Sequence, residues 1–436
     1  MQRWGLRTAA AAVTAVVAHL VLHYMVRTPI PSHMQNQAAV FVPELVNRET
    51  QSALLDLLKT KGVIPSNSAD TNFYEVKHEH IGEAQPLEAD GTCAHRYLMP
   101  NKNRTQCILP GRIDVARAFG LTGGIDGLKE NLGTLFSRLQ TFGIYIFDID
   151  AQEHAIIRSL FDSKDFLDAA AQVCPSHKQH LDPFQFNFIV QIPGQAVATH
   201  VDGVYFWGAS RFAFPQWLLA VMSFSGLFKD EFVDQVQVVG YVSDWALDPV
   251  RQNPSKFGEF VYWPNKDSTS DKRMPPLPRS GNAIDGSKSI HTTTVYRPEV
   301  EPPFIDKNKP SKLQHNATTD RWDLIVGNDL VASYATEDLR ISIVYRARCF
   351  RTKTDVERFQ AEAHDHSRMM DLDDVLNRLV ERGQQLTSTP SPPLSDRLAL
   401  AVWLLDTFMR YPYPSSSSTW FPFNYCGLFS APNWLC

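Results

Sequence analysis

Short apolar segments, separated by Gly, Pro and Asn or Asp, follow one another through the middle of the chain, from residue 184 to residue 350. They are FQFNFIVQIPG, AVATHVDGVYF, QWLLAVMSFSG, VDQVQVVGYVSDW, GEFVYWP, GNAIDGSKSIHTTTVY and LRISIVYRARCF. Many short strands at close spacing are typical of a β-sandwich or barrel. We therefore predict a β-rich domain here. QWLLAVMSFSG is too short to cross a membrane comfortably, so we assign it to the core of this domain.

Helical periodicity flanks the β-rich region on both sides. In residues 41–62, Leu54 and Leu58 belong to an apolar stripe that stops at Gly62, as expected of an amphipathic helix. Other segments predict helices at 123–140, 152–173, 355–386 and 396–412, and a strand at 141–150. The last helix is apolar on one face. We expect it to dock on the domain, with a membrane surface as the alternative.

The first 35 residues differ from the rest of the chain. An apolar run from Thr8 to Val26 is flanked by arginines, and no acidic residue precedes Glu44. No small-residue cleavage site follows the run cleanly, so the pattern favours the signal anchor of a single-pass membrane protein. A cleaved signal peptide and an organelle transit peptide are the alternatives.

Charge and cysteine spacing argue against several classes of function. The net charge is −5 and no run of Lys and Arg stands out, so nucleic acid is not an expected partner. None of the six cysteines forms a CxxC pair, which argues against a zinc or iron–sulfur site. Cys93 and Cys107 lie in one irregular segment. They form either a disulfide in an oxidising lumen or free buried thiols.

The segment AVATHVDGVYF contains a histidine and an aspartate two residues apart, His200 and Asp202. In a strand, residues i and i+2 project from the same face, and a buried carboxylate is costly unless it is paired or bound to a metal. His291, which opens a strand after a Gly/Asp turn, is the best third ligand. Two histidines and one carboxylate form a facial triad that suits non-haem Fe(II), although zinc accepts the same ligands.

The strand LRISIVYRARCF adds a candidate anion-binding group. Arg340 and Ser342 project from one face of it, together with Arg346 and Arg348. An arginine that faces inward is costly unless it meets an anion, and a guanidinium can hold a carboxylate with two parallel hydrogen bonds. The chain therefore combines a metal triad with a carboxylate-binding arginine.

The order HxD…H…RxS over consecutive β-rich segments resembles the Fe(II)/2-oxoglutarate-dependent dioxygenases. The resemblance covers about residues 184–350 and implies a double-stranded β-helix, or jelly roll, supported by flanking helices. It also implies the site residues. These are His200, Asp202 and His291 as the catalytic iron ligands, Arg340 with Ser342 on the distal carboxylate of 2-oxoglutarate, and Asn187 near the cofactor.

The chain departs from the family pattern in one respect. Arg340 follows His291 at a greater separation than is usual, and residues 297–335 between them look like an inserted loop and hairpin. Arg297 is the nearer alternative for the cofactor, and a surface ion pair of Arg340 with Asp338 or Glu337 is a further possibility. We prefer Arg340 because it opens the predicted last strand.

The resemblance implies a hydroxylation in which 2-oxoglutarate and O2 become succinate and CO2, with Fe(II) as the metal and ascorbate as a supporting reductant. The substrate stays open between a small molecule, a lipid and a protein side chain. Tyr205, Trp207 and Arg211 follow the metal-binding segment and are expected to line its entrance, with core packing as the alternative. Two rival classes remain: a non-catalytic jelly-roll scaffold, and a cupin-like metal-binding protein that does not use 2-oxoglutarate.

The predicted fold class is α+β, and we divide the chain into four regions. These are an anchor or targeting segment at 1–35, a helical and loop-rich support region at 36–180, the dioxygenase jelly roll at 181–352 and a helical extension at 353–436. The predicted anchor places the protein on a membrane of the secretory pathway, in the endoplasmic reticulum or Golgi. An organelle reached by a transit peptide is the alternative.

Overall fold

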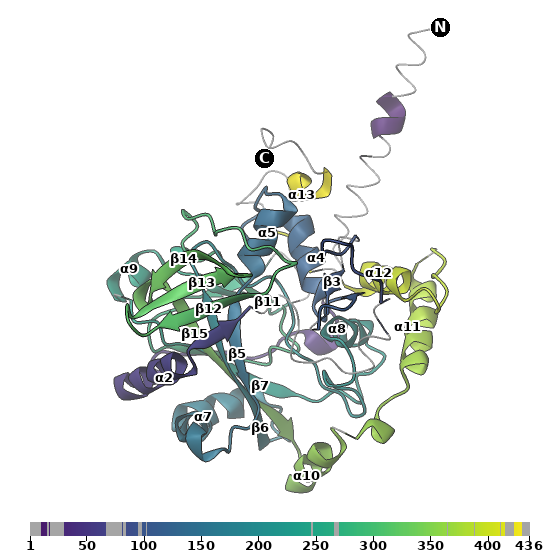
Figure 1. Cartoon of the computed structure of the whole chain (residues 1–436). Helices are drawn as coiled ribbons and strands as arrows, with labels where there is room; N and C mark the ends of the chain where they lie inside the picture. The colour runs from purple at the N-terminus through teal and green to yellow at the C-terminus, as the bar shows by residue number, and fades with distance from the viewer. Residues whose placement is uncertain are drawn as a thin grey trace.

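Figure 1 shows the structure of the chain as a computed structural model. It describes residues 10–14, 17, 30–66, 81, 84–94, 98–101, 103–245, 247–265, 270–363, 365–387, 389–409, 411–414 and 423–429. The described part of the chain is α+β, with helices around antiparallel sheets.

The largest sheet has six strands in the order β1-β10-β7-β15-β6-β5, and all neighbours are antiparallel. Its strands are β1 (Ala39–Val42), β5 (Phe142–Ile146), β6 (His180–Gln191), β7 (Gln235–Tyr241), β10 (Gly281–Ile284) and β15 (Arg340–Phe350). Strand β15 lies between β6 and β7. Its residues alternate, so Ile341 and Ile343 pack into the core while Arg340 and Ser342 face the other way.

A smaller sheet faces the inner side of the six-stranded one. It contains β8 (Phe260–Tyr262), β9 (Lys272–Met274) and β11 (His291–Thr293) in the order β11-β8-β9. His200 and His291 form an antiparallel bridge that adds the segment around residue 200 to its edge. The cavity described below is lined by both sheets.

The segment inserted between His291 and Arg340 builds a sheet of its own. It forms β12 (Ser311–Asn316), β13 (Arg321–Val326) and β14 (Asp329–Ala335), and β2 (Val63–Pro65) pairs with β12 as a fourth strand. The predicted hairpin is therefore a three-stranded meander. A separate pair, β3 (Met99–Pro100) and β4 (Cys107–Ile108), completes the strands of the described residues.

Helices α2 (Arg48–Lys61) and α7 (Lys164–Val173) lie on the outer face of the large sheet (Figure 1). Helix α6 (Ala155–Phe161) packs with them in the same hydrophobic core. The side chain of Asn47 caps the first turn of α2, and Gly62 ends it in a left-handed conformation with φ of 69°. Leu54 and Leu58 are buried, as the predicted stripe requires. The predicted helix at 41–62 starts only at Arg48, because the preceding residues pair as β1 with β10.

A second group of helices packs together away from this face and contains α8 (Gln216–Ser225), α11 (Leu372–Leu386) and α12 (Arg397–Phe408). The assignment of QWLLAVMSFSG to the set of strands is wrong, because this segment is the helix α8. Eight of its residues in succession, Trp217 to Phe224, are buried, so it shows neither a two-residue nor a helical period. Docking of residues 396–412 is confirmed, since α12 packs on α8 and α11.

Several other predicted helices are divided. The segment 123–140 is helical only in α5 (Leu132–Leu139), while α4 (Ile113–Thr122) ends at the left-handed Gly123. Ser163 separates α6 from α7 by capping the second helix. The remaining helices are α9 (Leu247–Gln252), α10 (Lys353–Glu362) and α13 (Tyr425–Phe429), with 3₁₀ turns at Ser32–Met34, Gln152–His154, Pro254–Lys256, Thr336–Asp338 and His366–Arg368.

Two disulfides join described residues, Cys93–Cys107 and Cys174–Cys349. The first is the pair that the sequence left open between a disulfide and free thiols. The second ties the end of α7 to the end of β15.

In the described part of the chain, no helix has both the length and the apolar character needed to cross a bilayer. The predicted anchor at residues 1–35 lies largely outside the described residues and stays a prediction.

Candidate metal centre

A cavity of about 230 Å³ lies between the two facing sheets. One wall consists of side chains from β6, β7 and β15, and the other includes Phe260 of β8 and the residues of β11. Arg112, just before α4, also borders the cavity. The predicted metal triad and Arg340 therefore both line this one cavity.

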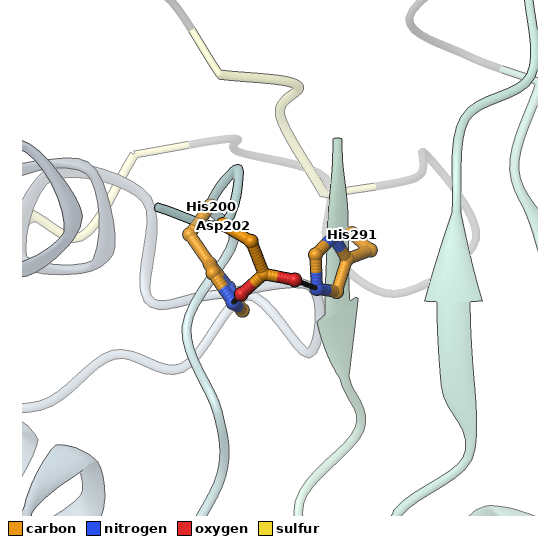
Figure 2. A group of neighbouring side chains, drawn as sticks. All are labelled: His200, Asp202 and His291. Carbon is orange, nitrogen blue, oxygen red and sulfur yellow. Dashed lines mark ion pairs between the residues drawn. The ribbon is translucent and has the colours of Figure 1, made fainter. Parts of the chain in front are cut away.

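His200, Asp202 and His291 gather at one side of the cavity, with all three candidate ligand atoms within 4.8 Å of one another. Figure 2 shows the carboxylate of Asp202 between the two imidazole rings. The Nε2 atoms of His200 and His291 lie 3.5 Å from Oδ1 and Oδ2 of Asp202, respectively. Bonds of about 2.1 Å to a single metal would separate neighbouring ligand atoms by roughly 3.0–3.5 Å. The spacing is therefore that of a metal site.

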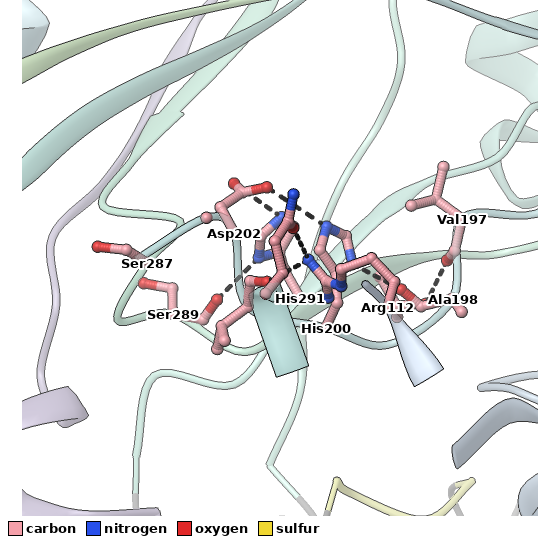
Figure 3. A network of polar contacts seen from close by, with 12 residues as sticks. Arg112, Val197, Ala198, His200, Asp202, Ser287, Ser289 and His291 are labelled. Atoms are coloured by element: carbon pink, nitrogen blue, oxygen red, sulfur yellow. Dashed lines mark hydrogen bonds and ion pairs between the residues drawn. The ribbon is translucent and has the colours of Figure 1, made fainter. Parts of the chain in front are cut away.

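Both rings are oriented by backbone carbonyl groups (Figure 3). Nδ1 of His200 lies 2.6 Å from the carbonyl oxygen of Ala198, and Nδ1 of His291 lies 2.8 Å from that of Ser289. A carbonyl oxygen only accepts, so in the neutral ring Nδ1 carries the proton and Nε2 keeps its lone pair. Burial and the neighbouring His200 lower the pKa of His291 to about 3, which keeps it in the neutral form that binds a metal.

Asp202 is buried and ionised. Burial alone would raise its pKa, but the positive charge of Arg346 holds the pKa well below its usual value. Its Oδ1 accepts a hydrogen bond from Nη2 of Arg346, whereas its Oδ2 is buried without a hydrogen-bond partner. A buried carboxylate oxygen without a partner is costly unless a cation binds it. The residues present therefore fit a divalent metal.

Arg340 lies at the opposite end of the same wall and is only 2% exposed. Nη1 donates to Oγ of Ser342 at 2.9 Å, Nε to the carbonyl oxygen of Phe257 at 3.2 Å, and Nη2 to that of Gly258 at 3.0 Å. These partners are neutral, and Arg340 forms no ion pair with any residue that the structure describes. Burial lowers the pKa of Arg340. A buried cation without a counterion is a place for an anion.

The alternatives to Arg340 are placed elsewhere. Arg297 is half-buried and pairs with Asp338 at 3.2 Å, and it does not border the cavity. Arg348 pairs with Asp182 at 2.7 Å outside the cavity. A surface pairing of Arg340 with Asp338 is thus absent, because Asp338 has Arg297 as its partner.

The other predicted residues divide between the cavity and the core. Asn187 and Arg211 border the cavity. Tyr205 does not, and is fully buried with its ring 5.2 Å from that of Phe184. Trp207 lies in a separate groove, where its ring contacts Phe359. The expectation that Tyr205 and Trp207 line the entrance is wrong, since packing against other aromatic rings removes more apolar surface from water.

Three polar residues of the wall received no role from the sequence. Gln185 and Gln237 border the cavity, and Arg346 contacts the candidate ligand Asp202. The alternation of the last strand placed Arg346 on the same face as Arg340, but it could not show which residue lies opposite. That depends on strand register, for which the sequence carries no signal here.

Comparison with known proteins gives distant likenesses to solved structures. No protein-family model and no curated protein matches the chain. Among solved structures it is similar to a Pseudomonas putida prolyl-4-hydroxylase (TM-score 0.30, 10% identity, covering 72% of this chain and 94% of that one). It is also similar to SnoK, a non-heme alpha ketoglutarate dependent carbocyclase from nogalamycin biosynthesis (TM-score 0.30, 7% identity, covering 74% of this chain and 87% of that one).

HygX from Streptomyces hygroscopicus, with nickel, 2-oxoglutarate and hygromycin B bound, shows the same degree of likeness (TM-score 0.30, 8% identity, covering 72% of this chain and 83% of that one). The case for a function therefore rests on this chain's own residues.

Proposed function

We propose that the chain is an Fe(II)/2-oxoglutarate-dependent dioxygenase that hydroxylates its substrate. One observation carries the proposal: a buried His–Asp–His set shares a cavity with a buried arginine that lacks a counterion. The first feature fits a metal and the second fits a carboxylate. A single molecule that binds the metal at one end and the arginine at the other satisfies both.

The arrangement of the sheets supports a double-stranded β-helix. A six-stranded antiparallel sheet and a smaller antiparallel sheet enclose the cavity, and most neighbouring strands of the larger sheet are not consecutive in the chain. Antiparallel strands that cross repeatedly between two facing sheets are characteristic of a jelly roll.

Iron is the metal that the ligand set favours. His200, Asp202 and His291 would provide two neutral nitrogens and one carboxylate oxygen, the facial triad of non-haem Fe(II) oxygenases. When bound, Fe(II) supplies the redox chemistry by which O2 oxidises 2-oxoglutarate to succinate and CO2 while one oxygen atom enters a substrate C–H bond.

The chain's own residues orient and enclose the reactants. Arg340 and Ser342 would hold the distal carboxylate of 2-oxoglutarate, with Arg340 fixed in advance by the carbonyl groups of Phe257 and Gly258. Between the two ends, apolar side chains such as Val344 border the cavity and exclude water from it. Asn187 borders the same wall and would complete its polar contacts to the cofactor.

We also propose a membrane-bound location in the secretory pathway. The apolar run from Thr8 to Val26 supports an anchor. The disulfides Cys93–Cys107 and Cys174–Cys349 support an oxidising compartment for the folded region.

Succinate formation tests the proposed activity. The full-length chain is supplied with Fe(II), ascorbate and 2-oxoglutarate under air, beside His200→Ala, Arg340→Ala and the surface control Arg158→Gln. We expect succinate from the wild type and from Arg158→Gln, because many such enzymes turn over 2-oxoglutarate slowly without substrate. We expect none from the other two variants.

Iron and 2-oxoglutarate binding, measured separately, distinguish the rival classes. Bound iron without any 2-oxoglutarate binding would replace the proposal by a cupin-like protein. If the chain bound neither iron nor 2-oxoglutarate, the proposal would be replaced by a non-catalytic jelly-roll scaffold.

A further inference from the structure

Two triplets in the chain match the acceptor pattern for N-linked glycans, which is Asn-X-Ser/Thr with any middle residue except proline. They are NRT at residues 103–105 and NAT at residues 316–318. A third triplet, NPS at residues 253–255, contains the excluded proline. Triplets of this kind also arise by chance, so the surroundings of each asparagine in the fold decide whether a glycan fits there.

Asn103 lies in an exposed turn between β3 and β4. The backbone amide of Arg104 donates to the carbonyl oxygen of Asn101 at 2.8 Å and closes this turn. The side chain of Asn103 forms no hydrogen bond to any residue that the structure describes. A glycan on its Nδ2 would therefore extend into solvent without breaking a hydrogen bond of the fold.

A disulfide encloses the same turn. Cys107 is the first residue of β4, and its bond to Cys93 closes a loop that contains the whole NRT triplet. Disulfides form and persist in oxidising compartments such as the lumen of the endoplasmic reticulum, which is also where N-glycans are transferred. The disulfide and the acceptor triplet therefore indicate the same compartment for one short segment of the chain.

Asn316 is less accessible than Asn103. It is half-buried at the end of β12, and its Nδ2 donates to Oδ2 of Asp323 on β13 at 3.3 Å. Its Oδ1 accepts a hydrogen bond from the backbone amide of Thr318 at 3.1 Å. A sugar on Nδ2 would replace one of its two hydrogens and crowd the contact with β13. Asn103 is therefore the better acceptor of the two.

We propose that Asn103 carries an N-linked glycan, and that the folded region therefore faces the lumen of the secretory pathway. In the transfer, Nδ2 of Asn103 bonds to C1 of the first sugar of a lipid-linked oligosaccharide diphosphate. The bond from C1 to the diphosphate oxygen breaks and the amide releases one proton, with no oxidation or reduction. The inference rests on the proposed location in the secretory pathway and not on the proposed dioxygenase activity.

The glycan would also fix the orientation of the proposed anchor. The apolar run from Thr8 to Val26 has arginines on both sides, so the charges around it do not determine which end faces the cytosol. With Asn103 in the lumen, the end that precedes Thr8 would lie in the cytosol.

Enzymatic removal of N-glycans tests the site. The full-length chain is expressed in eukaryotic cells with its own N-terminal segment, and its electrophoretic mobility is compared before and after treatment with an amidase that cleaves N-glycans. We expect the treated chain to migrate faster. The amidase converts a glycosylated asparagine to aspartate, so mass spectrometry of the peptide that contains residue 103 should show this conversion.

Three variants assign the glycan to the triplet. Asn103→Gln and Thr105→Val should each lose the glycan on this peptide, because each removes one required residue of the pattern. Thr105→Ser is the matched control and should keep it, since serine satisfies the pattern. Asn103→Gln should form as much succinate as the wild type, which shows that this variant is folded.

Protease digestion of intact membrane vesicles reads the location separately from the glycan. We expect the folded region to be protected until detergent is added. If it is protected but residue 103 carries no glycan, or if Thr105→Val keeps the glycan, the inference is overturned while the proposed location stands. If the folded region is digested without detergent, it faces the cytosol, and the proposed luminal orientation and the inference fail together.

Discussion

The two arginine ends of the cavity are held in different ways. Arg340 is fixed by neutral groups, the carbonyl oxygens of Phe257 and Gly258 and the hydroxyl of Ser342. Arg346 is fixed by one carboxylate, that of Asp202, which is also a candidate metal ligand. The Arg340 end is therefore set by the fold alone, whereas the Arg346 end depends on what Asp202 binds.

The largest expected effect comes from Asp202→Asn, which removes a ligand and the partner of Arg346 together. We expect iron content to fall at least tenfold and succinate formation roughly 100-fold, while Arg340 keeps its contacts. Elemental analysis and a succinate assay measure these losses. Asp182→Asn is the matched control, because Asp182 forms a buried pair with Arg348 outside the cavity. If that control lost iron equally, the effect would be general unfolding.

The next largest effect is expected from Arg340→Gln, which removes the charge at the Arg340 end of the cavity. Losing a charge-assisted hydrogen bond costs about 1.5–3 kcal/mol, so the KM for 2-oxoglutarate should rise roughly 10- to 100-fold. Iron content should not change. Arg297→Gln, which breaks only the partly exposed pair with Asp338, serves as control. Equal KM values for the two variants would show that Arg340 does not bind 2-oxoglutarate.

A smaller and more specific effect is expected from Gly258→Ala. Gly258 has φ of 76°, and a Cβ there would lie 2.9 Å from Nε of Arg340. The methyl group should displace Arg340 and raise the KM for 2-oxoglutarate several-fold without removing a charge. Gly226→Ala shares the backbone strain, with φ of 70°, but has nothing within 4 Å of the new Cβ. It should lose about 1 kcal/mol of stability and leave KM unchanged.

The smallest effect concerns a carboxylate that borders neither end. Burial raises the pKa of Asp126 from its ordinary value of 3.8 to about 6, so the ionised form destabilises the fold once the pH exceeds that range. Asp126→Asn should therefore raise the free energy of unfolding by about 1–3 kcal/mol at pH 7.5, and the gain should vanish near pH 4. Urea unfolding at both pH values measures it. A gain that is the same at both would mean that Asp126 does not titrate in this way.

The sequence predicted what depends on local spacing. His200 and Asp202 share a face because they are two residues apart, and alternation along the last strand put Arg340 and Ser342 on the cavity side. It failed where tertiary burial removes the period, as in α8, whose residues are buried on all sides. The sequence also could not predict that Gln185 and Gln237 lie opposite Arg346, because this depends on how β15 pairs with β6 and β7.

The position of β15 also constrains how the protein is made. This strand is the last of the large sheet in the chain, yet it lies between β6, which ends at Gln191, and β7, which ends at Tyr241. Until residues 340–350 leave the ribosome, both partners expose an unpaired edge, and such edges invite pairing with other chains. A chain truncated before Arg340 would therefore lose more than one end of the cavity: its large sheet would be divided between β6 and β7, and the two exposed edges would make it a substrate for chaperones and proteases.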